Sequence, residues 1–277
     1  MLVFHSHCQL GNQMFIYACA RSLAKKRKLN YCLSDNKQLI EYFDLSDQDK
    51  FLNTLKYQFF RIKNKIVPSS HSYFHFQDNR NDYAETLKKE PSKNAWYYGY
   101  FQGLNYFIEN QEEVKKLFTI RLQHQNKFNL IIDQFPKEKK ILVVHIRLKD
   151  YRTFGSEYLN GPDMTLPFAY YHKLLNSYPL EDYQVIFTSD EIETVKKEFQ
   201  NMKQAYFSEY EAIIDFQFIK NADVALISNS TFAWWAAWLN DKADKQIMVP
   251  EYFLGFKIKE EYPINIIPVE WTKVAVS

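Results

Sequence analysis

A short apolar segment, Ile141–Val144, places the strongest constraint on how this chain folds. It follows the charged segment Lys137–Lys140 and consists largely of β-branched residues. A run this short, bounded by charge, is typical of a strand buried on both faces of a parallel sheet. His145, Arg147 and Asp150 follow at its C-terminal end. Ligands of open α/β sheets bind outside the carboxyl ends of the strands. These residues therefore either bind an anionic ligand or form a purely structural Arg147–Asp150 pair.

The rest of the second half continues this alternation of strand and helix. We expect strands at 141–146, 184–188, 205–207, 223–227 and 246–249, and helices at 168–177, 193–200, 210–220 and 232–239. Alternating β and α elements with short connections favour right-handed crossovers and a parallel sheet. The pattern predicts a Rossmann-like unit.

The first half is less regular. Strands are expected at 2–4, 30–33, 72–76 and 96–101, and helices at 13–28, 105–118 and 123–135, with Asn12 capping the first helix. Pro136 and the charged residues after it form the natural seam. We therefore expect two domains, 1–136 and 137–277.

Composition excludes several classes of protein. The chain is 46% hydrophobic and 17% aromatic, and its net charge is +2, far from the basic excess of a nucleic-acid binder. Three cysteines without framework spacing favour reduced thiols. No segment has the length of a signal peptide or a membrane span, which predicts a cytoplasmic protein. The basic segments Lys25–Lys28 and Arg61–Lys65 are compatible with peripheral contact with an anionic membrane, or with a solvated helix face.

Polar residues end three of the expected strands in the second half. Besides the group around Arg147, these are Ser189 with Asp190, and the run Ser228–Thr231. Each of these two alone is typical of a helix cap. Together the three predict a nucleotide site, in which an arginine and helix N-termini hold phosphates and Asp190 accepts from a base or ribose. Because the chain has no acidic cluster suited to Mg²⁺, we expect no metal site.

Four motifs then resemble, in order, those of the bacterial α-1,2-fucosyltransferases, a family that includes the blood-group H enzymes. They are Leu10-Gly-Asn-Gln-Met-Phe15, Tyr98-Gly-Tyr-Phe-Gln102, His145-Ile-Arg147-Leu-Lys-Asp150-Tyr151 and Ser228-Asn-Ser-Thr-Phe-Ala-Trp-Trp. Phe187-Thr-Ser-Asp-Glu191 fits the place of the family's Ser-Asp-Asp. The match spans nearly the whole chain, and its last motif is highly specific.

The resemblance implies an inverting, metal-independent enzyme with two Rossmann-like domains (GT-B), no cofactor, and the donor site in the cleft between them. The C-terminal domain would bind GDP-fucose and the N-terminal domain the acceptor, a galactose-containing glycan of the bacterial surface. Arg147 would hold the diphosphate, and Asn12 would reach the donor from the other domain. The other donor-binding candidates are His145, Asp150, Ser189, Asp190, Asn229, Ser230, Thr231 and Phe232.

The chain departs from the family pattern at three places. Leu148 stands where the family has a second arginine, and Lys149 replaces a small glycine. Cys8 and Gln9 replace glycines before Leu10. Leu148 and the altered first loop leave room for a non-catalytic nucleotide-sugar or glycan-binding relic. The motif match also leaves open a fucosyltransferase of another linkage or with a protein acceptor.

The general base is not fixed by the motifs. His7 follows the first strand and its ordinary pKa range suits proton transfer, although its position is also that of a strand-end histidine of no catalytic role. Asp150 is the second candidate, although we expect it to orient Arg147.

Overall fold

The computed structural model describes residues 1–6, 8–46, 52–66, 72–76 and 94–276. They form two compact units: Met1–Arg121 with Pro263–Ile266, and Leu122–Tyr262 with Ile267–Ser277. The division follows Arg121 instead of Pro136, the seam expected from the sequence. The helix that precedes Pro136 belongs to the second unit because its residue Phe128 packs against Phe218 there, with ring centroids 5.4 Å apart.

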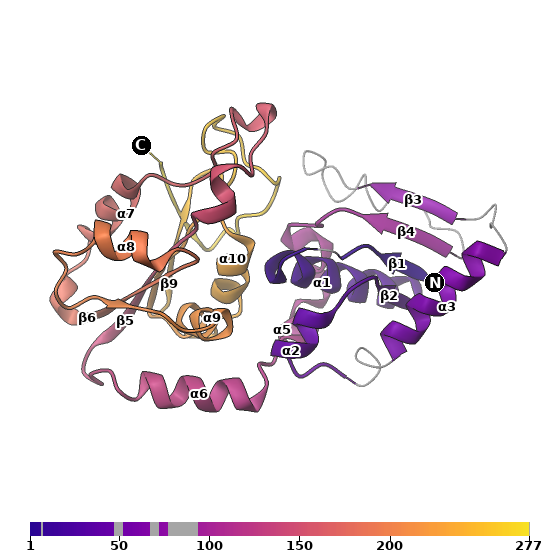
Figure 1. Ribbon diagram of the computed structural model, residues 1–277, viewed down its shortest axis with the longest axis horizontal. Helices are drawn as coiled ribbons and strands as arrows, with labels where there is room; N and C mark the ends of the chain where they lie inside the picture. The colour runs from indigo at the N-terminus through magenta and orange to yellow at the C-terminus, as the bar shows by residue number, and fades with distance from the viewer. Residues whose placement is uncertain (7, 47–51, 67–71, 77–93, 277) are drawn as a thin grey trace. The chain divides into compact units, whose positions relative to one another are not determined.

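The first unit is a four-stranded parallel sheet with helices (Figure 1). Its elements are β1 (Leu2–Phe4), α1 (Leu10–Arg27), β2 (Tyr31–Leu33), α2 (Lys37–Tyr42), α3 (Asn53–Ile66), β3 (Ser72–Phe76), β4 (Asn94–Tyr98), the 3-10 turns η2 (Leu104–Tyr106) and η3 (Ile108–Asn110), and α5 (Gln111–Leu117). The strand order is β2-β1-β4-β3, and every pairing is parallel. β1 therefore lies between β2, the next strand in the sequence, and β4, a strand much later in the sequence.

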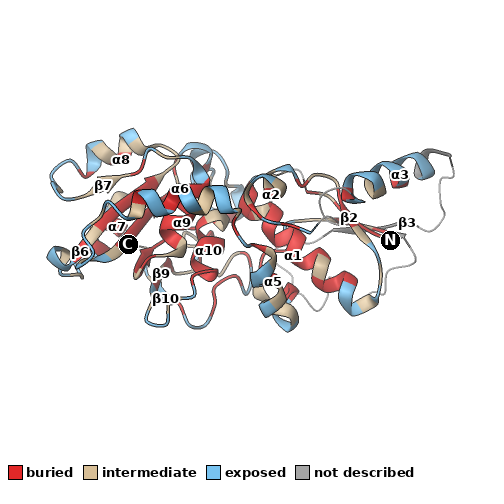
Figure 2. Ribbon diagram, turned by 90° about the horizontal axis from the view of Figure 1, so that it is seen from below, coloured by how far each residue is buried: buried red, intermediate tan, exposed pale blue. Residues whose placement is uncertain are grey.

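The core of this unit forms because β1 is apolar throughout and α1 is buried along most of its length (Figure 2). The Phe4 ring stacks on Tyr97 of the neighbouring strand at 4.6 Å. α1 begins at Leu10, with Gln9 at the capping position, so the expectation that Asn12 caps it is wrong. Asn12 lies in the first turn instead. The helix ends where Lys28 adopts a left-handed conformation and its N–H reaches back to carbonyls of the last turn.

The second unit has a six-stranded parallel sheet. It contains α6 (Leu122–Ile132), β5 (Lys140–Ile146), η4 (Lys149–Arg152), η5 (Glu157–Leu159), α7 (Phe168–Leu175), η6 (Leu180–Asp182), β6 (Tyr183–Ser189), α8 (Ile192–Glu198), β7 (Tyr206–Phe207), α9 (Ala212–Lys220), β8 (Val224–Leu226), α10 (Thr231–Trp238), β9 (Gln246–Pro250) and β10 (Thr272–Val274). The strand order β10-β9-β8-β5-β6-β7 is the doubly wound Rossmann order, in which strands are added outward in opposite directions from the adjacent pair β5 and β8.

Alternate residues of β5 face opposite layers of helices. Leu142, Val144 and Ile146 pack in one cluster with Tyr170 of α7 and Val195 of α8. On the other face, the His145 ring lies 5.9 Å from that of Phe232 in α10. The sheet is thus covered on both sides, which explains why its strands are short apolar runs instead of alternating ones.

Two further elements differ from the sequence expectations. The helix expected over 105–118 is broken into η2, η3 and α5, because Phe107 and Asn110 take non-helical conformations. The edge strand β10 was not expected, because it is three residues long, mostly exposed and carries Lys273.

Candidate active site

The reversal point of the second sheet brings two of the polar strand ends together. His145 lies at the end of β5, and Ser228 follows the neighbouring strand β8. Both side chains are buried, and His145 Nδ1 lies 2.9 Å from Ser228 Oγ. Ligands of doubly wound sheets bind outside the carboxyl ends of the strands at this reversal. The strand order therefore points to a ligand site at the same sheet edge where the sequence predicted one.

Arg147 joins the strand end of β5 to that of β6. Its Nη2 lies 2.7 Å from Asp150 Oδ1, and its Nε lies 3.3 Å from Asp190 Oδ2, the residue that follows β6. The Tyr151 ring lies beneath the guanidinium at 5.5 Å, and the arginine side chain is only 16% exposed. Two carboxylates and an aromatic ring fix the direction of this cation before any ligand arrives.

Asp190 also holds the backbone of the loop after β5. Its Oδ1 accepts a hydrogen bond of 2.9 Å from the Leu148 N–H. Ser189 beside it accepts a hydrogen bond of 3.0 Å from the Glu191 N–H, which is a local turn contact. The role expected for Asp190 toward a base or ribose stays a prediction, and its carboxylate faces Arg147 in this structure.

The run after β8 is almost fully buried. The Asn229 Nδ2 donates to the Met164 carbonyl at 2.9 Å, and its own carbonyl accepts from the Tyr151 hydroxyl at 3.1 Å. Asn229 therefore ties the loop after β5 to the loop after β8. Ser230 takes the capping position of α10 without a side-chain cap hydrogen bond, and Thr231 opens the helix. The first N–H groups of α10 thus face the site edge, a position that favours negative charge.

The buried imidazole of His145 stays neutral. Burial, with a smaller contribution from the Arg147 charge, lowers its pKa to about 3. A neutral ring that contacts Ser228 through Nδ1 is suited to hydrogen bonding and packing, and it does not change charge near neutral pH.

A second polar group lies at the carboxyl edge of the first sheet. The buried Gln102, which follows β4, donates from Nε2 to Asn12 Oδ1 at 2.8 Å. Because the Asn12 oxygen is used in this way, its amide N–H groups remain as donors. Gln102 lies in one of the sequence motifs, but no role was predicted for it. The signal was present, since a carboxamide followed an aromatic strand that ends beside β1.

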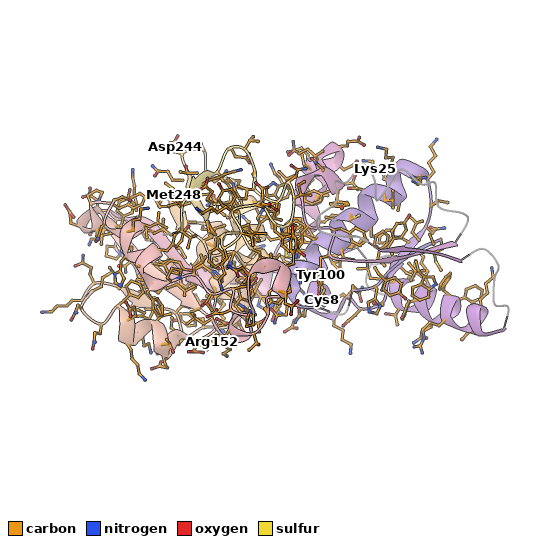
Figure 3. All side chains as sticks on the ribbon, turned by 90° about the horizontal axis from the view of Figure 1, so that it is seen from above. Cys8, Lys25, Tyr100, Arg152, Asp244 and Met248 are labelled. Atoms are coloured by element: carbon orange, nitrogen blue, oxygen red, sulfur yellow. The ribbon has the colours of Figure 1, made fainter. Side chains whose placement is uncertain are left out.

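His7, the proposed base, lies outside the described residues. Among the residues that the structure does describe, no group of three His, Cys, Asp or Glu side chains is placed to hold a metal ion. All three cysteines are free thiols. In Figure 3, Cys8 and Tyr100 mark the loops that follow β1 and β4, and Arg152 lies on the surface of the second unit.

Comparisons with known proteins agree with this architecture. The fold is that of the GT-B glycosyltransferases. It resembles the NodZ α-1,6-fucosyltransferase of Bradyrhizobium, soaked with GDP-fucose, at a TM-score of 0.55 and 11% identity, covering 88% of this chain and 96% of that one. It also resembles Arabidopsis thaliana FUT1 bound to GDP, at a TM-score of 0.53 and 12% identity, covering 90% of this chain and 69% of that one.

The sequence itself gives the family. Residues 8–260 match the profile of glycosyl transferase family 11, and the chain belongs to that family. It is 26% identical to the O-antigen biosynthesis glycosyltransferase WbnK of Escherichia coli, over 89% of this chain and 93% of the relative. It is 25% identical to an α-1,2-colitosyltransferase of Escherichia coli, over 96% of both chains. The expectations of a GT-B fold and of this enzyme family are confirmed.

Proposed function

We propose that this glycosyltransferase moves L-fucose from GDP-fucose to the 2-hydroxyl of a galactoside in a bacterial surface glycan, with inversion and without a metal ion. The observation that carries the proposal is the guanidinium of Arg147, fixed by Asp150 and Asp190 at the reversal point of the second sheet. The complexes of fold relatives with GDP or GDP-fucose support the donor, and the relative named for O-antigen biosynthesis supports the acceptor class.

The chemistry needs a cation where the leaving group gains charge. The acceptor oxygen attacks the anomeric carbon of fucose, the bond from that carbon to the β-phosphate oxygen breaks, and negative charge collects on GDP. An arginine already oriented by two carboxylates stabilises that charge without reorganising during the reaction. The N-terminus of α10, with Ser230, Thr231 and Phe232, adds dipoles for the phosphates and a ring for the sugar.

The acceptor hydroxyl must lose a proton on the face opposite the leaving GDP. Asp150 lies 2.7 Å from Arg147, a contact that favours its role as the group orienting the arginine. His7 remains our candidate base. Asn12, with its carboxamide oriented by Gln102, is our candidate for contact with the transferred sugar.

A transfer assay tests this function. The protein is incubated with GDP-fucose and an array of galactosides, with and without EDTA, and products are identified by mass spectrometry and NMR. We expect a 2-O-fucosyl product that survives chelation. A product that requires Mn²⁺ would contradict the arginine-and-dipole account, and hydrolysis or binding without transfer to any acceptor would favour a non-catalytic relic.

Colitose transfer is a second candidate, because one relative is named an α-1,2-colitosyltransferase. The same acceptor array with a colitosyl nucleotide donor distinguishes the two. Fucose transfer should exceed colitose transfer if the first proposal holds. A product linked at another galactose hydroxyl would revise the linkage and leave the donor assignment intact.

A further inference from the structure

An apolar stripe runs along the outer surface of α3, in a part of the first unit remote in sequence from the candidate site residues. Leu55, Phe59 and Ile62 recur at intervals of four and three residues, so they share one face of the helix. They are 46%, 69% and 57% exposed, and Leu52 just before the helix is 42% exposed. Figure 2 shows much of α3 as exposed surface. Large apolar side chains aligned in this way usually mark an interaction surface.

The stripe is not needed for packing within the unit, because α3 packs on the rest of the unit through a different face. Phe60 is 2% exposed and its ring lies 5.1 Å from Trp96. The Asn53 side chain accepts a hydrogen bond from the Leu33 N–H of β2 and donates one to the Leu33 carbonyl. The helix is therefore already anchored, and the stripe lies away from the anchored side.

The charge of α3 identifies the partner. The helix contains Lys56, Arg61 and Lys63 and no acidic residue. The other basic segment of this unit differs, since Lys25 and Lys26 of α1 pair with Glu113 and Glu109. A helix with an apolar stripe and basic residues beside it lies in the interface of an anionic membrane, with its apolar side chains among the acyl chains and its cations at the headgroups.

We propose that α3 docks the first unit on an anionic lipid bilayer, with Leu55, Phe59 and Ile62 inserted and the neighbouring lysines and arginine at the headgroups. The contact is peripheral. No described helix is long and apolar enough to cross a membrane. The inference does not depend on the nature of the sugar that the enzyme transfers.

Flotation of the full-length protein with lipid vesicles tests the proposal. Vesicles of phosphatidylcholine with about one-third phosphatidylglycerol should bind the protein, whereas pure phosphatidylcholine should bind it weakly, and about 0.5 M NaCl should reduce the difference. The Phe59→Ser/Ile62→Ser double variant should lose about tenfold or more in vesicle affinity. Arg61→Gln/Lys63→Gln should lose several fold, and only on the anionic vesicles.

The matched control is Leu122→Ser/Leu130→Ser on α6, where the side chains are 69% and 71% exposed. It removes a comparable amount of exposed apolar surface and should leave vesicle binding unchanged. All variants should keep the native melting temperature and transfer to a soluble acceptor. Equal loss in both apolar double variants would overturn the proposal. The proposal would also be overturned if the protein did not bind vesicles and instead formed a dimer, measured by sedimentation, that only the α3 substitutions dissociate.

Discussion

The two sheets of this enzyme end in chemically different edges. At the carboxyl edge of the second sheet, Arg147 stands between two carboxylates, beside the neutral, buried His145. At the corresponding edge of the first sheet, the described polar pair is the uncharged Asn12 and Gln102. Similar parallel topology therefore supports two kinds of recognition. A fixed cation suits a nucleoside diphosphate, and carboxamides suit neutral oxygen and nitrogen groups.

The largest expected effect comes from removing the cation. Arg147→Ala should lower kcat by on the order of 10²–10³, because a charged donor at a developing anion is lost. Arg147→Lys should rescue little, since lysine cannot form the forked contact to two phosphate oxygens. The matched control is Arg152→Gln, because Arg152 makes an exposed pair with Glu191 nearby. A folded Arg147→Ala enzyme with near-native turnover would make this arginine structural.

Uncoupling the carboxamide pair should have a smaller effect. Gln102→Leu should lower kcat/KM by about tenfold, because the Asn12 amide loses the hydrogen bond that orients it. In a double-mutant cycle, Gln102→Leu should cost little more once Asn12 is alanine. Asn53→Ala, another buried carboxamide of this unit, should lower stability and spare kcat/KM. Additive losses at Asn12 and Gln102 would show that the two residues act independently.

The substitution Leu148→Arg adds a second cation to the charged edge and tests how tightly that edge is packed. From the family pattern one would expect Leu148→Arg to leave activity within a few fold, but Leu148 is 5% exposed and packs in the core around β5. Burying an arginine there should lower the free energy of unfolding by about 2 kcal/mol or more. Denaturant unfolding, with Leu148→Met as the control, measures it. Unchanged stability would mean that this loop opens readily to solvent.

The last effect lies outside both edges and is a pH dependence of stability that arises at Asp215 in α9. Burial raises the pKa of Asp215 to about 8, and the hydrogen bond from Ser208 only partly opposes this. The folded state therefore keeps a proton that the unfolded chain releases above about pH 4. Stability from this group should fall as pH rises from about 4 to 8, by on the order of 1 kcal/mol per unit. Asp215→Asn should flatten the dependence of the free energy of unfolding on pH, measured by denaturant unfolding. An unchanged pH dependence would show that another group causes it.

Elements whose local pattern agrees with the topology were predicted best from the sequence. The run Ile141–Val144 was expected to be a strand buried on both faces, and the polar residues after three strands were expected to converge. Their convergence follows from the Rossmann order, which forces parallel carboxyl ends to one edge. The helix expected over 105–118 is interrupted where Phe107 and Asn110 take non-helical backbone conformations, which helical periodicity alone does not reveal.

Contacts between distant segments could not be read from the sequence. The pairing of Asp190 with the Leu148 N–H joins residues 42 positions apart, and Gln102 reaches Asn12 across 90. A single sequence records residue types along the chain but not which side chains meet after folding. The position of α1 was missed for a local reason, because Asn12 resembles a cap while the helix begins at Leu10.

Calorimetric titration of GDP into three proteins tests the difference between the two edges most directly. The proteins are the native enzyme, Arg147→Ala and Asn12→Ala. We predict that GDP binding weakens by about tenfold to a hundredfold when the guanidinium is lost, because charge-assisted hydrogen bonds to phosphate are removed. Asn12→Ala should bind GDP within about twofold of the native enzyme while losing turnover, since its amide is proposed to serve the sugar. Equal weakening by both substitutions, or native GDP affinity in Arg147→Ala, would contradict the assignment of the nucleotide to the charged edge.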